Sequence, residues 1–295
     1  MYIATCVDGM EEICEREVDG RKAWKGRVEF EGEVKKFNSV KNIYDLWKGF
    51  KFSSQKDIIA QAKTINNEIA GTFKVVANRE GEHNFSSMEI ERSVGEVFHE
   101  KGFKVDLKKP RSIVFVDIKD EMCFIGLLKE FELNKRKYRF KRITPNLDCT
   151  IAYGMMKLAD IKDDEIIFNP HCKDGVIAVE AALNSRGRIY CDDNSNNMRN
   201  ADINIRLAEA DVKYGKPEKI DKVLAILPSY IRRLNNGAVD RILDEFFEEF
   251  KDVKRMVAVC SMDIESFTKG FKTNKKLELS AGDSKYFIFV LEKTI

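Results

Sequence analysis

The segment from residue 168 to 183 has the residue types and spacing that come nearest to binding a cofactor. The apolar run Ile166–Phe168 predicts a buried parallel strand, a tight turn follows it, and a helix begins at Val176. A strand, a glycine-bearing turn and a helix form the first unit of a nucleotide-binding α/β sheet. Glycines let such a turn adopt positive φ and approach its ligand. Only Gly175 remains here, and Lys173 stands where a side chain should obstruct the ligand.

The segments around this turn predict a doubly wound sheet. Helical and apolar strand patterns alternate from residue 151 onward, and the sequence ends in an alternating pair at 276–279 and 286–291. This order implies parallel strands with right-handed connections and an antiparallel edge. Only Glu209–Lys222 separates a helix from the next buried strand, which leaves room for a stub strand at Val212–Tyr214 but for no helix.

The composition sets limits on compartment and partners. The chain has 295 residues, enough for two or three domains, and its net charge of +2 means that binding to a polyanion would depend on a local patch. The seven scattered cysteines and three histidines predict reduced thiols and no metal site. No apolar run has membrane-spanning length, so we expect a cytoplasmic protein without a membrane partner.

Three parts can be distinguished along the chain. Residues 1–56 follow a β-α-β-β-α order, with a helix predicted at Asn42–Gly49, which is typical of a ferredoxin-like α+β unit. Residues 57–143 contain a capping box at Ser86–Glu89, a predicted hairpin and a basic stretch that closes the unit. Residues 144–295 form the predicted Rossmann-like part.

The basic stretch Lys135–Arg142 interleaves cationic and aromatic side chains. Cations neutralise phosphates and aromatic rings stack on unpaired bases, so the pattern suits RNA. The alternative is a solvated edge strand whose charges discourage aggregation. Lys108, Lys109 and Arg111 flank Pro110 on a predicted loop and could join such a patch.

The middle part carries four motifs in order: Gly71–Val75, Asn78–Ser87, Val105–Pro110 and Lys135–Arg139. With them the chain resembles the archaeal and eukaryotic THUMP-domain tRNA methyltransferases that methylate the exocyclic amine of guanosine. The resemblance implies a ferredoxin-like domain and a THUMP domain that grip the acceptor end of tRNA. A class I domain that binds S-adenosylmethionine (SAM) would follow. The implied RNA contacts are Arg79, His83, Lys108, Lys109, Arg111, Lys135, Arg136, Lys137 and Arg139, of which His83 could instead be a core residue.

The resemblance also assigns the cofactor residues. Asn169–Ala181 aligns without a gap with the family's first motif, Asp-Pro-Phe-Cys-Gly-Ser-Gly-Thr-Ile followed by Ile-Glu-Ala. Asp193 matches the acid that takes the ribose hydroxyls, so the implied cofactor-binding residues are Asn169, Gly175 and Asp193. The positions that differ clearly are Asn169, His171, Lys173, Asp174 and Val176.

The family's base-binding motif, Asn-Pro-Pro-Tyr, reads Leu227-Pro228-Ser229-Tyr230 here. Methylation of an exocyclic amine needs a hydrogen-bond acceptor that orients its hydrogens, and leucine has none. Loss of such a positioned group commonly lowers the rate by about 10²–10³. Tyr230 and Pro228 remain as candidate catalytic residues, although Tyr230 could equally cap the edge of the sheet.

Three hypotheses follow. The first is a tRNA-binding protein whose methyltransferase-type domain transfers methyl groups weakly or not at all, with no cofactor. The second is an active SAM-dependent tRNA guanine-N2 methyltransferase in which Asn169 or Asp174 supplies the missing polar contact. The third makes the C-terminal domain an interface, with the helix around Phe246, Phe247 and Phe250 docking a protein partner or a second copy. An ordinary core helix is the preferred alternative to the third.

Overall fold

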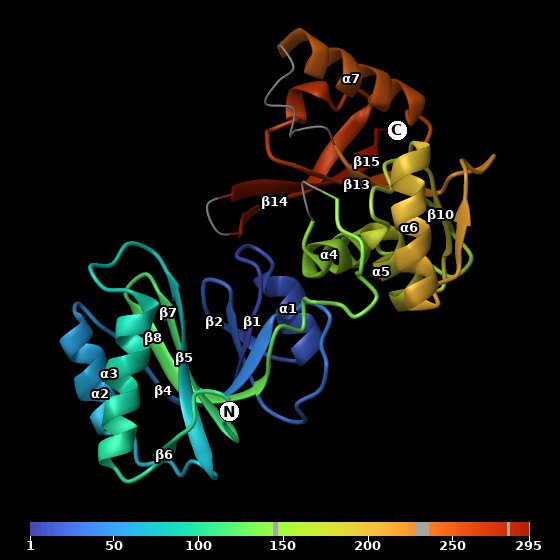
Figure 1. Ribbon diagram of the computed structural model, residues 1–295. Helices are drawn as coiled ribbons and strands as arrows, with labels where there is room; N and C mark the ends of the chain where they lie inside the picture. The colour runs from blue at the N-terminus through green and yellow to red at the C-terminus, as the bar shows by residue number, and fades with distance from the viewer. Residues whose placement is uncertain (144–146, 228–235, 282–283, 295) are drawn as a thin grey trace. The chain divides into compact units, whose positions relative to one another are not determined.

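The computed structural model describes residues 1–143, 147–227, 236–281 and 284–294 (Figure 1). The chain divides into two compact units, and each contains one mixed β-sheet. The first unit comprises Met1–Thr5, Val18–Lys36 and Val40–Glu132; the second comprises Cys6–Glu17, Phe37–Ser39 and Leu133–Ile295. No helix among the described residues combines the length and the apolar character that crossing a membrane requires.

The first unit has an eight-stranded sheet in the order β2-β3-β1-β4-β8-β7-β5-β6. Helices α2 and α3 cover one face of it and enclose an apolar core with side chains from β5, β7 and β8. The bounds are β1 Tyr2–Thr5, β2 Arg21–Trp24, β3 Arg27–Phe30, β4 Asn42–Lys51, α2 Gln55–Lys63, β5 Thr72–Glu80, α3 Ser87–Glu100, β6 Lys104–Val105, β7 Ser112–Lys119 and β8 Met122–Glu130.

Two local predictions for the middle of the chain are confirmed. Helix α3 begins with a reciprocal capping box, in which the Glu89 N–H donates to Ser86 Oγ at 3.2 Å and the Ser86 N–H donates to Glu89 Oε2 at 2.7 Å. Both bonds satisfy backbone donors that the first turn of a helix leaves without partners. Strands β7 and β8 form the predicted antiparallel hairpin.

The predicted helix at Asn42–Gly49 is wrong, because these residues belong to β4. Strand β4 pairs antiparallel with β1 on one side and with β8 on the other. Its register against β8 shifts between Leu46 and Lys48, where a bulge breaks the alternation of the strand. The apolar residues 43, 46, 47 and 50 have the sequence spacing of a helix face, and the bulge explains how a strand can carry that spacing. Most of these residues are aromatic or β-branched, which suits a strand.

The second unit has a seven-stranded sheet in the order β11-β10-β9-β12-β13-β15-β14. Strands β9 to β13 are parallel, and β15 runs antiparallel to β13 and β14, as predicted. The bounds are α1 Glu11–Val18, α4 Cys149–Ala159, β9 Ile166–Asn169, α5 Val176–Asn184, β10 Arg188–Cys191, α6 Ser195–Ala208, β11 Val212–Tyr214, β12 Lys222–Ile226, α7 Asn236–Glu249, β13 Arg255–Cys260, β14 Phe271–Ala281 and β15 Ser284–Lys293.

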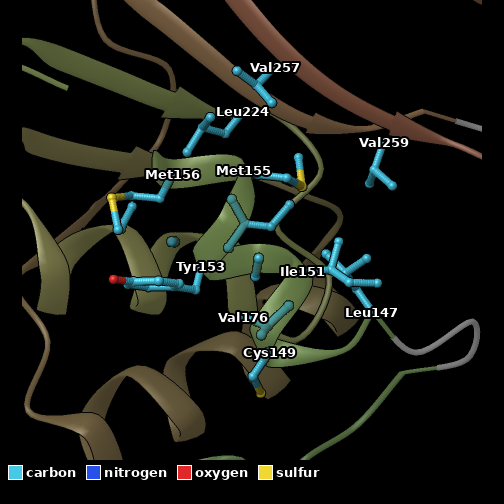
Figure 2. Packing of buried hydrophobic residues seen from close by; sticks show 14 of the residues in the cluster. Leu147, Cys149, Ile151, Tyr153, Met155, Met156, Val176, Leu224, Val257 and Val259 are labelled. Atoms are coloured by element: carbon cyan, nitrogen blue, oxygen red, sulfur yellow. The ribbon is translucent and has the colours of Figure 1, made fainter. Parts of the chain in front are cut away.

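Each face of this sheet has its own core. Side chains of α4 and α5 pack with those of β12 and β13 on one face (Figure 2), and α6 adds Ala201 and Ile205 to this core. Helix α7 covers the other face with Leu243, Phe246 and Phe247, and Phe250 follows directly after it. The predicted stub strand is confirmed as β11, and the described chain passes from it to β12 without a helix. This places the turn of residues 169–175 at the carboxyl end of β9, between β10 and β12.

Candidate functional site

The turn after β9 begins with a buried asparagine. The Asn169 side chain is 1% exposed, and its Nδ2 donates to the Leu224 carbonyl at 2.8 Å. This bond ties the end of β9 to β12. The Asn169 Oδ1 atom is buried and has no hydrogen-bond partner among the described residues. Asn169 therefore acts within the sheet through its amide nitrogen.

Lys173 adopts the conformation that a glycine would adopt more easily. Its φ is 52°, in the left-handed region, which costs an L-residue about 1–2 kcal/mol. Its backbone N–H donates to Asp193 Oδ2 at 2.8 Å. Burial lowers the pKa of the Lys173 ammonium, while the charges of Asp193 and Asp174 oppose that effect. The strained turn thus bonds directly to the acid that the resemblance assigns to the cofactor ribose.

The Asp193 carboxylate already accepts three hydrogen bonds from the protein. Besides the Lys173 N–H on Oδ2, its Oδ1 accepts from the Asn194 N–H at 2.7 Å and from Asn197 Nδ2 at 2.9 Å. A carboxylate has about four acceptor positions, so about one remains. A ribose presents two hydroxyl groups. Binding both at Asp193 would require this network to open.

The surviving glycine has a packing role. Gly175 has a φ of 82°, and a Cβ placed on it would lie 3.3 Å from Ala201 Cα on α6. The positive φ and the close approach of the turn to α6 therefore both favour glycine at this position, whether or not a ligand binds. Its presence alone does not distinguish a cofactor turn from a structural one.

Two ion pairs attach the predicted RNA-binding stretch to this turn and its helix. Arg139 donates to Asp174 Oδ2 from Nη2 at 2.7 Å and from Nε at 3.1 Å, and both side chains are at least 95% buried. Arg136 Nε donates to Glu180 Oε1 at 3.0 Å, and the Tyr138 hydroxyl donates to the same oxygen at 2.7 Å. Since these guanidinium groups are engaged inside the protein, Arg136 and Arg139 are not available as the predicted RNA contacts. The Asp174 carboxylate is buried and is paired with Arg139 through Oδ2.

His171 fills space beside α7. Its ring stacks on Phe246, with centroids 5.8 Å apart and planes at 26°. Burial lowers the pKa of His171, with Lys173 adding to the effect and Asp193 opposing it, so the ring is neutral near pH 7. Its Nδ1 has no hydrogen-bond partner among the described residues. The preferred expectation, a structural residue and not a general base, agrees with this packing.

Leu227 is a core residue. Its side chain is completely buried in the core beneath α7, and its N–H donates to the Val259 carbonyl at 2.9 Å. The candidate catalytic residues Pro228 and Tyr230 lie outside the described residues. Three cavities are described in the second unit, with volumes of about 260, 280 and 430 Å³. None of these three is lined by Asn169, Gly175 or Asp193.

Two other predicted RNA contacts in the first unit are tied up in local packing. The His83 ring packs against Phe52 and Phe85, at centroid distances of 5.6 and 5.1 Å, and these two rings also contact each other. His83 Nε2 lies 2.7 Å from the Asp120 carbonyl, which can only accept, so Nε2 carries the proton. The Nδ1 atom then accepts from Arg79 Nη1 at 3.2 Å. Both residues shape the segment that leads into α3.

The remaining predicted contacts have exposed side chains. Asp106 Oδ1 accepts the N–H groups of Lys108 and Lys109 at 3.0 and 2.9 Å, which shapes their loop. Arg111 packs its aliphatic chain over Gly71, where an added Cβ would lie 2.7 Å from Arg111 Cδ. The packed aliphatic part of the side chain therefore holds the Arg111 guanidinium in place. The exposed set is Lys108, Lys109 and Arg111 in the first unit, and Lys135 and Lys137 in the second.

The strain at Lys173 gives a stability prediction. We expect Lys173→Gly to raise the free energy of unfolding by up to about 1 kcal/mol, because glycine relieves the left-handed backbone but adds freedom to the unfolded chain. Urea denaturation measures this. Glu209→Gly is a matched control, since Glu209 ends α6 with the same φ of 52°. If Lys173→Gly destabilises the protein while Glu209→Gly stabilises it, the backbone of Lys173 is not strained.

Comparison with known families identifies both parts of the chain. A model of the THUMP domain matches residues 52–128, and a model described as the RMKL-like methyltransferase domain matches residues 136–276. The chain contains a THUMP domain followed by an RMKL-like methyltransferase domain. Its THUMP domain thus lies in the first unit, and the turn with Lys173 lies in its methyltransferase domain.

Curated relatives carry related names. The tRNA (guanine(6)-N2)-methyltransferase of Thermus thermophilus is 37% identical over 129 residues, which cover 43% of this chain and 38% of the relative. The protein of the same name from Archaeoglobus fulgidus is 28% identical over 207 residues, covering 62% of this chain and 53% of the relative. The chain therefore matches about half or less of the length of these relatives.

Solved structures share the whole fold. TrmN from Thermus thermophilus has a TM-score of 0.78 and 23% identity, and the match covers 99% of both chains. SMU.472, a methyltransferase solved with S-adenosylhomocysteine, has a TM-score of 0.82 and 17% identity, covering 100% of this chain and 98% of the other. The mixed α/β architecture, a THUMP domain followed by a class I methyltransferase domain, is thus confirmed.

Proposed function

We propose that this protein binds tRNA through its THUMP domain and that its methyltransferase domain transfers methyl groups weakly or not at all. The observation that carries the proposal is the Asp193 carboxylate, which accepts three hydrogen bonds from the protein itself, one of them from the strained Lys173 N–H. We also propose that the protein is cytoplasmic. The division at residues 56 and 143 and the contact with the acceptor end of tRNA stay predictions.

The expected ribose-binding residue and the expected base-binding residue both support this proposal. At the ribose end, about one acceptor position of Asp193 is left for two hydroxyl groups. At the base end, the buried Leu227 offers no acceptor for an exocyclic amine. Asp193 and Leu227 lie on different segments and share no hydrogen bond among those described, so the two losses rest on separate observations.

Charge supports an RNA partner for the THUMP domain. The exposed Lys108, Lys109 and Arg111 occupy one short loop whose shape Asp106 fixes. A loop with fixed shape loses little entropy when it binds, and each cation that meets a phosphate releases counterions.

Asn169, Gly175 and Asp193 are the residues that would hold SAM if the domain accepts it, and SAM would then supply the methyl group.

Two titrations of the same sample test the proposal. We expect a tRNA pool to bind with an affinity that falls steeply as salt rises, and we expect SAM to give no binding heat at micromolar concentrations. In Lys108→Ala/Lys109→Ala, the slope of log affinity against log salt should fall by about 1–2. Fluorescence anisotropy measures the first and calorimetry the second.

The matched control for the double variant is Lys35→Ala/Lys36→Ala, which removes another adjacent pair of exposed lysines from the same unit. Its salt slope should equal that of the unchanged protein. If the slope of log affinity against log salt is equal in all three proteins, the proposal that the Lys108 loop binds RNA is contradicted. Micromolar SAM affinity would contradict the silent methyltransferase domain.

An active SAM-dependent tRNA guanine-N2 methyltransferase is the second candidate. It is favoured by the names of the relatives and by the position of Asp193, which lies two residues after the end of β10 and bonds to the turn after β9. This version requires Asp193 to exchange the Lys173 N–H for a ribose. The interface hypothesis for α7 has less support, because Phe246, Phe247 and Phe250 are buried in the core of their own unit.

A further inference from the structure

The outer edge of β5 in the THUMP domain is largely unpaired. Strand β6 pairs with β5 only at Thr72 and Phe73, whereas β7 pairs with β5 along its other side from Phe73 to Glu80. No described strand pairs with the outer side of β5 beyond Phe73. An open strand edge presents backbone donors and acceptors to any extended segment that approaches it.

The direction of the backbone N–H and C=O groups of β5 identifies which residue can pair with a strand added at the outer edge. The Phe73 carbonyl accepts the Asp106 N–H at 2.8 Å, and the Ala77 N–H donates to Glu91 Oε1 at 3.0 Å, so both point toward the outer edge. Backbone groups alternate along a strand with period two. Val75, midway between them, therefore directs its own N–H and C=O outward, next to the segment that follows β6.

An apolar groove of about 400 Å³ follows this edge, between β5 and one side of α3. Helix α3 lies along β5 (Figure 1). Three residues on the groove's rim are exposed although apolar: Met88 by 72%, Leu107 by 73% and Val105 by 45%. Apolar side chains gathered around a groove are typical of a binding site and are uncommon on a surface that contacts only water.

The charges in the groove favour a protein over a nucleic acid. Lys74 and Arg92 are balanced by two carboxylates, those of Glu91 and Glu96, on the same lining. A polyanion entering the groove would meet both carboxylates, so it gains nothing from the cations. Phe73 on the lining is completely buried, and the one exposed aromatic ring there is that of His99, whose Nδ1 lies 3.3 Å from the Phe103 carbonyl. An apolar, nearly uncharged segment fits this surface best.

Gly95 keeps the groove open from the helix side. It lies inside α3, where glycine is unfavourable compared with alanine. A Cβ on Gly95 would meet only Val75 Cγ2, at an ordinary contact distance of 3.7 Å. Packing of the protein itself therefore does not require glycine. The space that Gly95 leaves belongs to the groove.

We propose that this groove binds an extended apolar segment of a protein partner, which adds as a strand to the outer edge of β5. The segment pairs with the Val75 backbone and places alternate side chains between β5 and α3, a known mode of peptide recognition. This interaction is separate from RNA binding by the Lys108 loop, and it goes beyond the proposed function.

The test uses the full chain and defined peptides. The probes are octapeptides with Val, Ile, Leu or Phe at alternate positions and Thr or Ser between them, titrated singly while amide NMR shifts are recorded. We expect at least one to bind with a Kd below about 1 mM and to shift the Val75 and Gly95 amides. N-methylation of alternate peptide nitrogens should abolish binding, because it removes the donors that pair with the strand.

Two variants of one residue provide the control. Gly95→Leu fills the groove and should weaken peptide binding at least about tenfold, whereas Gly95→Ala should change it less than about threefold and shows that substitution at this site allows folding. The proposal is overturned if no octapeptide binds up to 1 mM. It is also overturned if a single-stranded octaribonucleotide shifts the same amides. A third contrary result is that the protein self-associates and Gly95→Leu abolishes the self-association, because the groove would then bind a second copy of the chain.

Discussion

Arg139→Ala is expected to lower the free energy of unfolding by about 3–5 kcal/mol, while the folded variant keeps its affinity for tRNA. The Asp174 carboxylate is 3% exposed and accepts two bonds from Arg139, so the variant leaves a buried charge without its partner. Arg139 also donates to the Leu147 carbonyl. Urea denaturation measures the loss, and anisotropy at a temperature where the variant remains folded measures tRNA binding.

Lys137→Ala is the matched control, since Lys137 is an exposed cation two positions away on the same segment. It should change stability by less than about 0.5 kcal/mol. Arg139→Ala/Asp174→Ala should cost less than the two single variants together, because the double variant removes both buried charges. Lost tRNA affinity in Arg139→Ala with unchanged stability would instead make Arg139 an RNA contact.

The sequence could have indicated the buried role of this basic stretch. Glu180 is a single acid within the otherwise apolar helix α5, and a buried acid requires a partner. Nothing in the sequence says which cation reaches it, because that depends on how residues 133–143 pack within the second unit. Composition suggested RNA contacts for Arg136 and Arg139, whereas the structure places both side chains in ion pairs inside the protein.

The sheet of the methyltransferase domain was predictable because its parallel strands are buried on both faces and read as short apolar runs. β12, for example, is buried at every position. The prediction for the residues of β4 was wrong for the opposite reason. It is partly exposed and carries a bulge, so its apolar residues lose the period of two on which a strand prediction depends.

At the turn after β9, comparison with the family's first motif places Lys173 at a glycine position, and Lys173 has the positive φ that glycine adopts easily. The sequence did not indicate the partner of its N–H. The bond from its N–H to Asp193 joins the turns after β9 and β10, and such a contact between loops follows from the folded sheet alone. That bond changes Asp193 from a free acceptor into a structural one, which no motif comparison could reveal.

Methyl transfer to unmodified tRNA from labelled SAM is expected to be at least about 10²-fold slower than for the Thermus thermophilus relative assayed in parallel. The reason is the target site, where the family's asparagine is replaced by the buried Leu227. An amine without a positioned acceptor does not present its lone pair to the methyl group. Scintillation counting of precipitated tRNA measures the rate, and a rate equal to that of the relative contradicts the proposal.

Restoring the motif at this position alone should fail. Leu227→Asn puts an amide into the apolar core beneath α7, so we expect a loss of about 2–5 kcal/mol in the free energy of unfolding and no gain in methyl transfer. Leu183→Asn, at a leucine that is 50% exposed on α5, should cost much less. Because Leu227 packs with Val223, Ala225 and Phe246, a return to asparagine requires this core to be rebuilt first. Appreciable methyl transfer by a stable Leu227→Asn variant would show that the site needs only its acceptor.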